Sequence, residues 1–223
     1  IRNLSYLPKA SVLYTLQAKL VHNLLAKISL PTCAIGFRRN ESYKSYLLPH
    51  VGNEYYLRID IKDFFPSITD KLIASELACF LSLNTPEETD KIITLITDIV
   101  TRNGVLPQGA STSPAISNIV MARIDQRILK YCQVFDITYT RYADDLLFSS
   151  PRYDFSQKKW FFKKIKYILK SSNFRINHTK IKYAQKELSL NGYVISHTDV
   201  RLSRKRLSDI RHVVSKMQKN HSI

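Results

Sequence analysis

The feature that most constrains this chain is a pair of adjacent aspartates, Asp144 and Asp145, between two apolar segments. Segments 137–141 and 146–149 flank the pair, and both are rich in residues that favour β-strands. The sequence therefore predicts a β-hairpin with two acids at its tip. Unit charges about 4 Å apart repel by roughly 4 kcal/mol at an effective dielectric constant of 20, so such a pair needs a cation or water beside it.

A third acid, Asp60, ends another extended segment, 55–59. Successive strand residues point to opposite faces, so only one of Asp144 and Asp145 would share a face with Asp60 unless the turn re-aims the other. Acids that meet at the ends of strands can hold two Mg²⁺ ions for phosphoryl transfer. An Asp-Asp pair taken alone is more often a solvated turn.

Three ordered motifs decide between these interpretations. They are DIKDFFPSI at 60–68, LPQGASTSP at 106–114 and YADD at 142–145. In these motifs the chain resembles the reverse transcriptases, and the motif sequences are most similar to those of bacterial retron-type enzymes. The resemblance covers nearly the whole chain and implies an RNA-directed DNA polymerase.

The order of predicted elements favours an α+β fold in which helices pack on a mainly antiparallel sheet. The resemblance implies a right-hand polymerase, with part of the fingers in 1–54 and the start of a helical thumb in 201–223. Residues 55–200 would form the palm, with the catalytic motifs and an inserted helical portion of the fingers. Because the chain begins at Ile1 and stops within a helical pattern, we expect an excerpt of a longer protein.

The resemblance also implies catalytic roles. Asp60 and Asp144 would bridge two Mg²⁺ ions, Asp145 would support the site, and the backbone carbonyl of Ile61 would complete the shell of the triphosphate-bound ion. Lys180 stands where the family has a lysine thought to protonate the departing pyrophosphate, although an ordinary surface lysine is the alternative.

Further residues are implied in substrate binding. Phe65 matches the family's aromatic gate, whose ring would clash with a ribose 2′-hydroxyl, while the neighbouring Phe64 reads as a core aromatic. Asp63 is the acid of this motif that we do not expect in catalysis. Nucleotide contacts are also expected from Arg58, Gln108 and Gly109, and primer or template contacts from Tyr142, Ala143, Asn191 and Gly192. The basic residues Arg2, Arg38 and Arg39 are candidates for the triphosphate or template, with solvated charge as the alternative.

Composition agrees with a polyanionic partner. The net charge is +16, from 34 Lys and Arg against 18 Asp and Glu. The resemblance implies the partners more closely: a structured non-coding RNA as template and primer, the RNA–DNA product, dNTPs and an effector protein of an antiphage defence system, with no membrane. Three scattered cysteines, Cys33, Cys79 and Cys132, indicate neither disulfides nor zinc, which favours the cytoplasm, and the resemblance implies that of a bacterium.

Two differences from the sequences of retron-type enzymes leave alternative functions open. Leu47 and Leu48 stand where many retron enzymes have Asn-Ala, and 190–192 reads Leu-Asn-Gly where they have Val-Thr-Gly. One alternative is another bacterial defence-associated reverse transcriptase, primed by a protein hydroxyl. Another is a non-catalytic palm that serves as an RNA-binding scaffold for an effector, against which the intact acids argue.

Local patterns predict the remaining elements. Apolar residues from Leu13 to Ile28 recur at helical spacing and predict an amphipathic core helix. Thr69, Thr85 and Ser113 are predicted helix caps, the second with Glu88 in a capping box and Ile92 on the inward face of its helix. We also predict a lysine-rich helix over 155–171, short strands at 174–177 and 188–196 with a turn at 191–192, and an amphipathic helix over 203–219. His50 is expected to pack or hydrogen-bond, because no partner lies at metal spacing.

Overall fold

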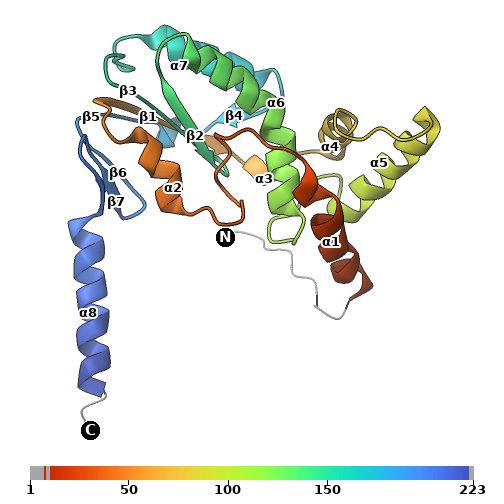
Figure 1. Cartoon of the computed structure of the whole chain (residues 1–223), viewed down its shortest axis with the longest axis horizontal. Helices are drawn as coiled ribbons and strands as arrows, with labels where there is room; N and C mark the ends of the chain where they lie inside the picture. Colours follow the sequence, from red (N-terminus) through yellow and green to blue (C-terminus); the bar gives the residue numbers. More distant parts are fainter. Residues whose placement is uncertain (1–7, 9–10, 221–223) are drawn as a thin grey trace.

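The structure of the chain is a computed structural model that describes residue 8 and residues 11–220 (Figure 1). The described residues form helices, three short 3₁₀ turns and strands in the following order: α1 (Val12–Asn23), η1 (Leu25–Lys27), α2 (Tyr43–Leu47), η2 (Leu48–His50), β1 (Tyr55–Lys62), α3 (Phe64–Ser67), α4 (Asp70–Leu77), α5 (Pro86–Val100), α6 (Ser113–Gln133), β2 (Thr138–Tyr142), β3 (Asp145–Ser150), α7 (Lys159–Lys170), β4 (Arg175–Ile176), η3 (His178–Lys180), β5 (Lys182–Gln185), β6 (Leu188–Leu190), β7 (Tyr193–Ile195), β8 (Val200–Leu202) and α8 (Arg204–Asn220).

Strand β1 is the centre of the main sheet. One of its edges pairs antiparallel with β3, and β3 pairs in turn with β2 to form the predicted hairpin. The other edge pairs with β5 along the first half of β1 and with β4 at its end. In this register Asp60 lies directly opposite Asp145, which brings the three motif acids to one end of the sheet.

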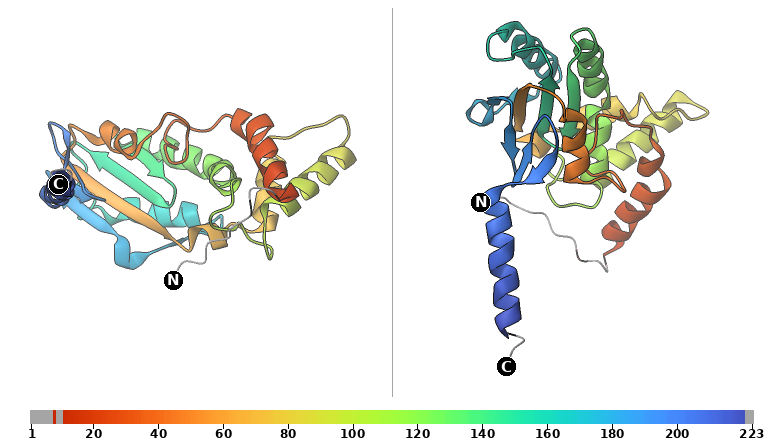
Figure 2. Two further views of the ribbon diagram at one scale, coloured as in Figure 1. Left: turned by 90° about the horizontal axis from the view of Figure 1, so that it is seen from below. Right: turned by 60° about the vertical axis from the view of Figure 1, so that its left-hand side comes forward.

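The two faces of this sheet are covered differently (Figure 2). Alternate strand residues such as Ile59, Ile61 and Phe148 are buried in the large core that also contains the apolar sides of α6 and α7. The opposite face carries a smaller core with Tyr46, Tyr56 and other apolar residues from α2 and the β6–β7 hairpin. Asp60, two residues beyond Arg58 on β1, belongs to this second face, where the helices of the large core do not cover it.

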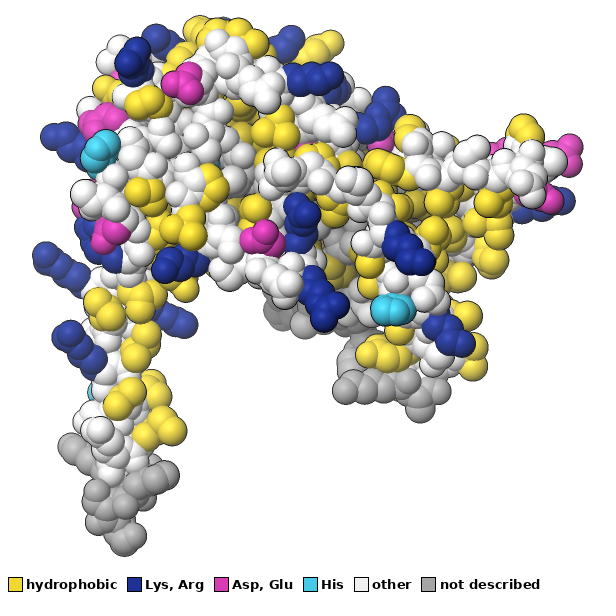
Figure 3. All heavy atoms as spheres, in the orientation of Figure 1, with side chains coloured by type: hydrophobic (Ala, Val, Ile, Leu, Met, Phe, Trp, Pro, Cys, Tyr) yellow, Lys and Arg dark blue, Asp and Glu magenta, His cyan; other side chains and the backbone are white. Residues whose placement is uncertain are grey.

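Two helical parts extend from different sides of this body (Figure 1). Helices α4 and α5 pack together beyond the lower part of α6, and α1 contacts α5. Helix α8 follows the small β6–β7–β8 sheet and projects away from the rest of the molecule. Its predicted apolar stripe is present and exposed, with Val213 and Met217 56% and 59% accessible (Figure 3).

Several predicted helix boundaries are confirmed. Thr69 and Thr85 cap α4 and α5 by accepting the N–H groups of Leu72 and Glu88. Asn191 and Gly192 form the tight β6–β7 turn, both with positive φ (47° and 85°), as a two-residue hairpin turn requires. The α+β architecture with mainly antiparallel strands is as predicted, and the division into fingers, palm and thumb stays a prediction.

The prediction of a core helix at the start of the chain is only partly confirmed. Leu20, Leu24 and Ile28 pack against the large core. Leu13 and Leu16, in the first half of α1, are exposed, and the fully buried residue of α1 is Gln17, which donates to the Ile99 carbonyl. Periodicity placed the apolar side correctly but could not show that only part of it is covered.

Three smaller corrections concern helices near the site. Ser113 is the first residue of α6 and not its cap; its hydroxyl donates to the Pro107 carbonyl instead. On α5, Ile96 and Val100 of the predicted apolar run are buried, but Ile93 is buried with them and Ile92 is 40% exposed. The lysine-rich helix begins at Lys159, since Phe155 is buried in the preceding loop.

Candidate active site

The three motif acids gather where β1 and the β2–β3 hairpin end. Asp60 and Asp145 are buried opposite one another, and Asp144 is half-buried at the hairpin turn. The backbone carbonyl of Asp144 accepts the N–H of Ile61 at 2.9 Å, which ties the turn to the end of β1. Ala143, at φ 56°, takes the left-handed conformation that bends the chain here. The turn thus re-aims one acid, and all three lie beside the same strand end.

Two cations of the chain balance these acids. The Arg58 guanidinium hydrogen-bonds to Asp145 through Nε at 2.9 Å and through Nη2, and Nη2 lies 4.0 Å from Asp60 Oδ2. The Lys180 ammonium lies 2.9 Å from the same Asp60 oxygen. Burial raises the pKa of Asp145 above its usual range, and the attraction of Arg58 opposes this in part. Asp145 is therefore held by Arg58, while Asp60 and Asp144 are the acids turned to the cleft.

A cleft of about 1160 Å³ opens at this strand end. Its lining brings together seven of the predicted site residues, which come from all three motifs and from η3: Asp60, Ile61, Phe65, Gln108, Ala143, Asp144 and Lys180. Phe37, Arg102, Asn103 and Asn177 also line the cleft and were not among the predicted site residues. Arg102 and Asn103 come shortly before the second motif, and that position was the available clue to them.

The remaining predicted site residues lie outside the cleft lining. Arg58 binds Asp145, and Gly109 lies in the loop before α6. Asn191 is at the β6–β7 turn, where its amide donates to the Tyr43 hydroxyl at 2.9 Å, and Gly192 lies against Arg206. Their predicted substrate contacts stay predictions. Arg38 and Arg39 line a separate groove beside α1, and Arg2 lies outside the described residues.

Aromatic rings connect the cleft to the β6–β7 hairpin. Phe65 contacts Phe37, Phe37 contacts Tyr142, and Tyr142 contacts Tyr43 edge-on at 5.2 Å between ring centroids. Tyr43 in turn contacts Tyr193. Phe64 is buried in the core, as predicted, and meets Phe65 edge-on. The row gives an apolar floor that runs from the acids to the predicted primer contacts.

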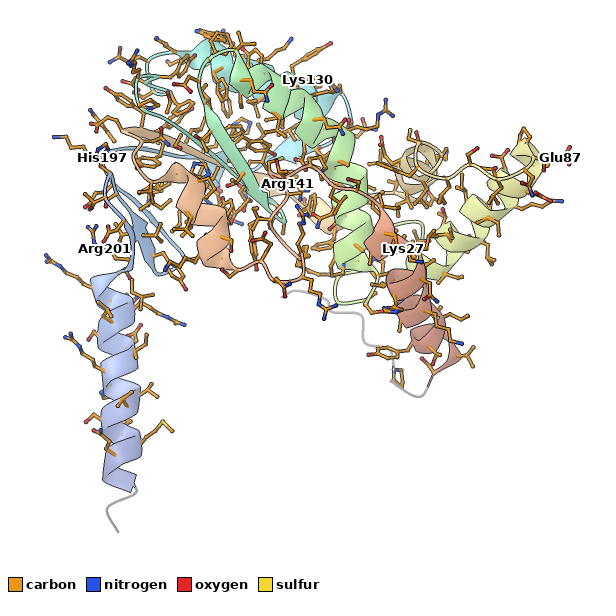
Figure 4. All side chains as sticks on the ribbon, in the orientation of Figure 1. Lys27, Glu87, Lys130, Arg141, His197 and Arg201 are labelled. Carbon is orange, nitrogen blue, oxygen red and sulfur yellow. The ribbon has the colours of Figure 1, made fainter. Side chains whose placement is uncertain are left out.

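A buried ion pair supports the hairpin from behind. Arg141 lies on β2 (Figure 4) and Asp125 on α6, and both side chains are fully buried. The Arg141 guanidinium contacts both carboxylate oxygens at 2.8–3.0 Å. Nη1 of Arg141 also donates to the Ala143 carbonyl, and the Tyr139 hydroxyl donates to Asp125. Burial disfavours the charged guanidinium, but Asp125 keeps the pKa of Arg141 above its ordinary value. One side chain thus couples helix α6 to the bend beside the motif acids.

The loop at Gly36 also presses against the hairpin. Ile35 and Gly36 donate their N–H groups to the Arg141 carbonyl, and the Asn118 amide donates to the Gly36 carbonyl at 2.8 Å. A Cβ on Gly36 would lie 2.6 Å from the Ala143 nitrogen, closer than two such atoms approach. Only glycine fits this position without displacing the hairpin.

His50 is structural, as predicted. It is fully buried, with Nε2 2.8 Å from the Thr140 hydroxyl and Nδ1 2.6 Å from the Ser149 hydroxyl. Thr140 donates its proton to the Tyr46 carbonyl, so it must accept from Nε2–H, which leaves Nδ1 to accept from Ser149. Burial lowers the pKa of His50 to about 3 and keeps the ring neutral.

The donors in the cleft fit a hard divalent cation. Asp60 and Asp144 present carboxylate oxygens, the ligand type that Mg²⁺ prefers, and no histidine or cysteine lines the same cleft. Within the described part of the chain, no three His, Cys, Asp or Glu side chains converge into a ready-made metal cluster.

Comparison with known proteins agrees with this geometry. Residues 7–195 match the family model described as reverse transcriptase (RNA-dependent DNA polymerase). The chain belongs to the reverse transcriptase family. It is 36% identical to the retron Ec86 reverse transcriptase of Escherichia coli over 138 residues, which are 62% of this chain and 41% of that protein. It is also 36% identical to the retron Mx65 reverse transcriptase of Myxococcus xanthus over 152 residues, 61% of this chain and 35% of the relative.

These relatives confirm the resemblance to retron-type reverse transcriptases, and the chain spans less than half the length of either. Among solved structures, apo telomerase from Candida tropicalis superposes with a TM-score of 0.60 at 14% identity, covering 87% of this chain and 39% of that one. That likeness confirms the polymerase fold. None of the helices in the described residues combines the length and the apolar character of a membrane span.

Proposed function

We propose that this reverse transcriptase chain extends a primer with deoxynucleotides on an RNA template, with Asp60 and Asp144 as the metal-binding acids. The observation that carries the proposal is that the cleft joins both acids to Lys180 and to the Gln108 loop, although these residues are far apart in sequence. Membership of the reverse transcriptase family supports the same activity.

Nucleotidyl transfer would need the chain mainly to position the substrates and to balance their negative charge. Two Mg²⁺ ions, held by Asp60, Asp144 and the Ile61 carbonyl, would supply activation of the primer hydroxyl and neutralisation of the triphosphate. Asp145 keeps Arg58 beside Asp60 and so maintains the local charge balance. Lys180 lies at Asp60 with half of its side chain exposed, so its ammonium is placed to give a proton to a departing pyrophosphate.

Substrate selection is proposed for two residues of the cleft. Phe65 stands at the cleft wall between Phe64 and Phe37, where its ring would exclude a ribose 2′-hydroxyl. Gln108 lies in the same lining and offers an amide to the incoming nucleotide or template.

We further propose that the template and primer belong to a structured non-coding RNA and that the enzyme works in antiphage defence with an effector protein. Similarity to retron reverse transcriptases supports this. On the full-length protein, digestion of the co-purifying nucleic acid with RNase and DNase tests it. A discrete DNA joined to RNA, absent from Asp144→Asn, is expected; DNA attached to protein would overturn the retron assignment.

Polymerisation itself is tested by primer extension on an RNA template with Mg²⁺ and dNTPs. Asp144→Asn should reduce the rate by at least about 100-fold, as loss of a group that stabilises transition-state charge does. Asp63→Asn is the matched control, because Asp63 is an exposed acid of the same cleft with no expected role in catalysis. Equal extension by the wild type and Asp144→Asn would refute the assignment.

A further inference from the structure

Helix α7 and the segment after it form an unusually basic region whose basic residues, apart from Lys180, do not line the active-site cleft. From Phe155 to Lys186 the chain contains no Asp or Glu. The same stretch carries these basic residues: Lys158, Lys159, Lys163, Lys164, Lys166, Lys170, Arg175, Lys180, Lys182 and Lys186. Basic side chains line the edge of the molecule where α7 lies (Figure 3). Such a concentration of one sign of charge attracts a polyanion.

The lysines of α7 stand beside aromatic rings. The apolar side of the helix is buried through Phe161, Ile165, Ile168 and Leu169, so its lysines face outward. Lys164 lies over the rings of Tyr131 and Tyr167, and Tyr167 is 62% exposed. Basic groups interleaved with exposed rings are the composition of surfaces that bind single-stranded nucleic acid.

A groove between α7 and β5 combines both features. It has a volume of about 410 Å³ and is lined by Ser156, Lys159, Phe162, Lys163, Lys166 and Tyr183. Tyr183 is 41% exposed and therefore offers part of its ring to a ligand. The lining matches the two halves of an unpaired nucleotide, with rings for the base and ammonium groups for the phosphate.

This groove is separated from the active-site cleft by the short η3 turn. The ring of His178, at the start of η3, meets Phe162 edge-on at 6.2 Å between ring centroids. Lys180, at its end, contacts Asp60 in the cleft. A strand that leaves the cleft past η3 would therefore meet the lysines of α7.

We propose that the α7–β5 groove binds an unpaired segment of the RNA that also serves the active site. The inference rests on the proposed function and adds a second contact for the same RNA outside the cleft. From Lys159 to Lys170 the helix extends about 16 Å at 1.5 Å per residue, enough to follow several nucleotides. The rings favour RNA over a lipid surface or an acidic peptide, because bases stack on them whatever their sequence.

The test compares two probes on the same protein: a short RNA–DNA template–primer hybrid that fills only the cleft, and the same hybrid carrying about 20 unpaired RNA nucleotides at either end. The variant is Lys163→Ala/Lys166→Ala. Its matched control is Lys71→Ala/Lys91→Ala, which removes two exposed lysines from α4 and α5. Affinity is measured at several salt concentrations, and thermal unfolding checks that every variant is folded.

The unpaired extension should increase the affinity of wild type and control but not that of the α7 variant. For the extended probe, the slope of log affinity against log salt should become shallower by about 1.4 in the variant, from about 0.7 for each of two lost contacts to a single-stranded phosphate. Tyr183→Leu should reduce about fivefold the increase in affinity that the unpaired RNA gives, which is the lower end of the effect of losing one stacked base.

An equal gain from the extension in the α7 variant and the control would overturn the proposal. A second result would also overturn it: anionic phosphatidylserine vesicles bind the wild type but not the α7 variant, while the unpaired RNA extension increases the affinity of both proteins equally. The lysines would then bind a lipid surface. Primer extension on the short hybrid reports on the cleft separately. If the wild type does not extend the primer of the short hybrid, the proposed function is refuted. If it does extend the primer but the unpaired RNA does not increase its affinity, only the proposal for the α7–β5 groove is refuted.

Discussion

Replacing Gly36 with alanine should impair catalysis far more than stability. The added Cβ would lie 2.6 Å from the Ala143 nitrogen and 3.0 Å from the Tyr142 Cα. Carbon and nitrogen atoms pack at about 3.5 Å, so the hairpin would have to recede by roughly 0.9 Å. Both contacts are backbone atoms that cannot rotate away, and the Arg141–Asp125 pair fixes the hairpin from its other side.

The magnitudes follow from this displacement. Overpacking of this kind costs typically about 1–3 kcal/mol of unfolding free energy. A catalytic group misplaced by about 1 Å can cost 100-fold in rate, so Gly36→Ala should slow primer extension about 100-fold while the protein stays folded. Urea unfolding and single-nucleotide incorporation measure the two effects on the same preparation.

Gly52→Ala is the control for the loss of stability alone. Gly52 has a φ of +86° and no atom within 4 Å of its added Cβ, so alanine there is strained but touches nothing. Strain in this region costs roughly 1–2 kcal/mol, similar to the cost expected at Gly36. If Gly36→Ala polymerised within twofold of Gly52→Ala, the idea that this loop sets the position of the catalytic turn would be wrong.

Three further outcomes are expected. His50→Gln should flatten the pH dependence of stability. In the folded wild type the pKa of His50 is about 3, below the ordinary 6.5, so the contribution of His50 to stability is complete above pH 6.5 and falls by about 1.4 kcal/mol per pH unit as the pH drops towards 3. Urea unfolding at pH 6.5, 5.5 and 4.5 measures this difference. Asp125→Ala leaves the Arg141 charge buried and unpaired and should cost about 3–5 kcal/mol, whereas Asp125→Leu/Arg141→Met should recover most of it; equal losses in urea unfolding would contradict the pairing. Phe65→Ala should admit ribonucleotides, and an unchanged ratio of dNTP to rNTP incorporation would remove Phe65 from the sugar gate.

The parts of the site that lie in short motifs could be predicted from the sequence. The apolar, β-favouring segments on either side of Asp144 and Asp145 indicated the hairpin, and the run that ends at Asp60 indicated its partner strand. The Asn191–Gly192 turn followed from the conformations that these two residues tolerate. In each case neighbours along the chain decide the local structure, so one sequence is sufficient.

What could not be predicted depends on contacts between distant segments. Asp125 reads as an ordinary polar residue of a helix and Arg141 as one of a strand, and nothing in either pattern shows that they are buried together. The close approach of Gly36 to the hairpin comes from the folding of a loop over a turn more than 100 residues later. Leu13 and Leu16 show the converse, because an apolar period alone does not supply a surface to cover it.

The central place of β1 has a consequence for local opening of the structure. Its backbone is paired on one edge to β3 and on the other to β5 and β4, and its apolar residues lie in the larger core. Amide protons in such a strand exchange with solvent only on nearly global unfolding, so Ile59 and Ile61 should be among the slowest in hydrogen exchange. The strand end that bears Asp60 would then stay folded while the exposed helix α8 frays. The position of Asp60 would therefore not depend on whether nucleic acid or nucleotide is bound.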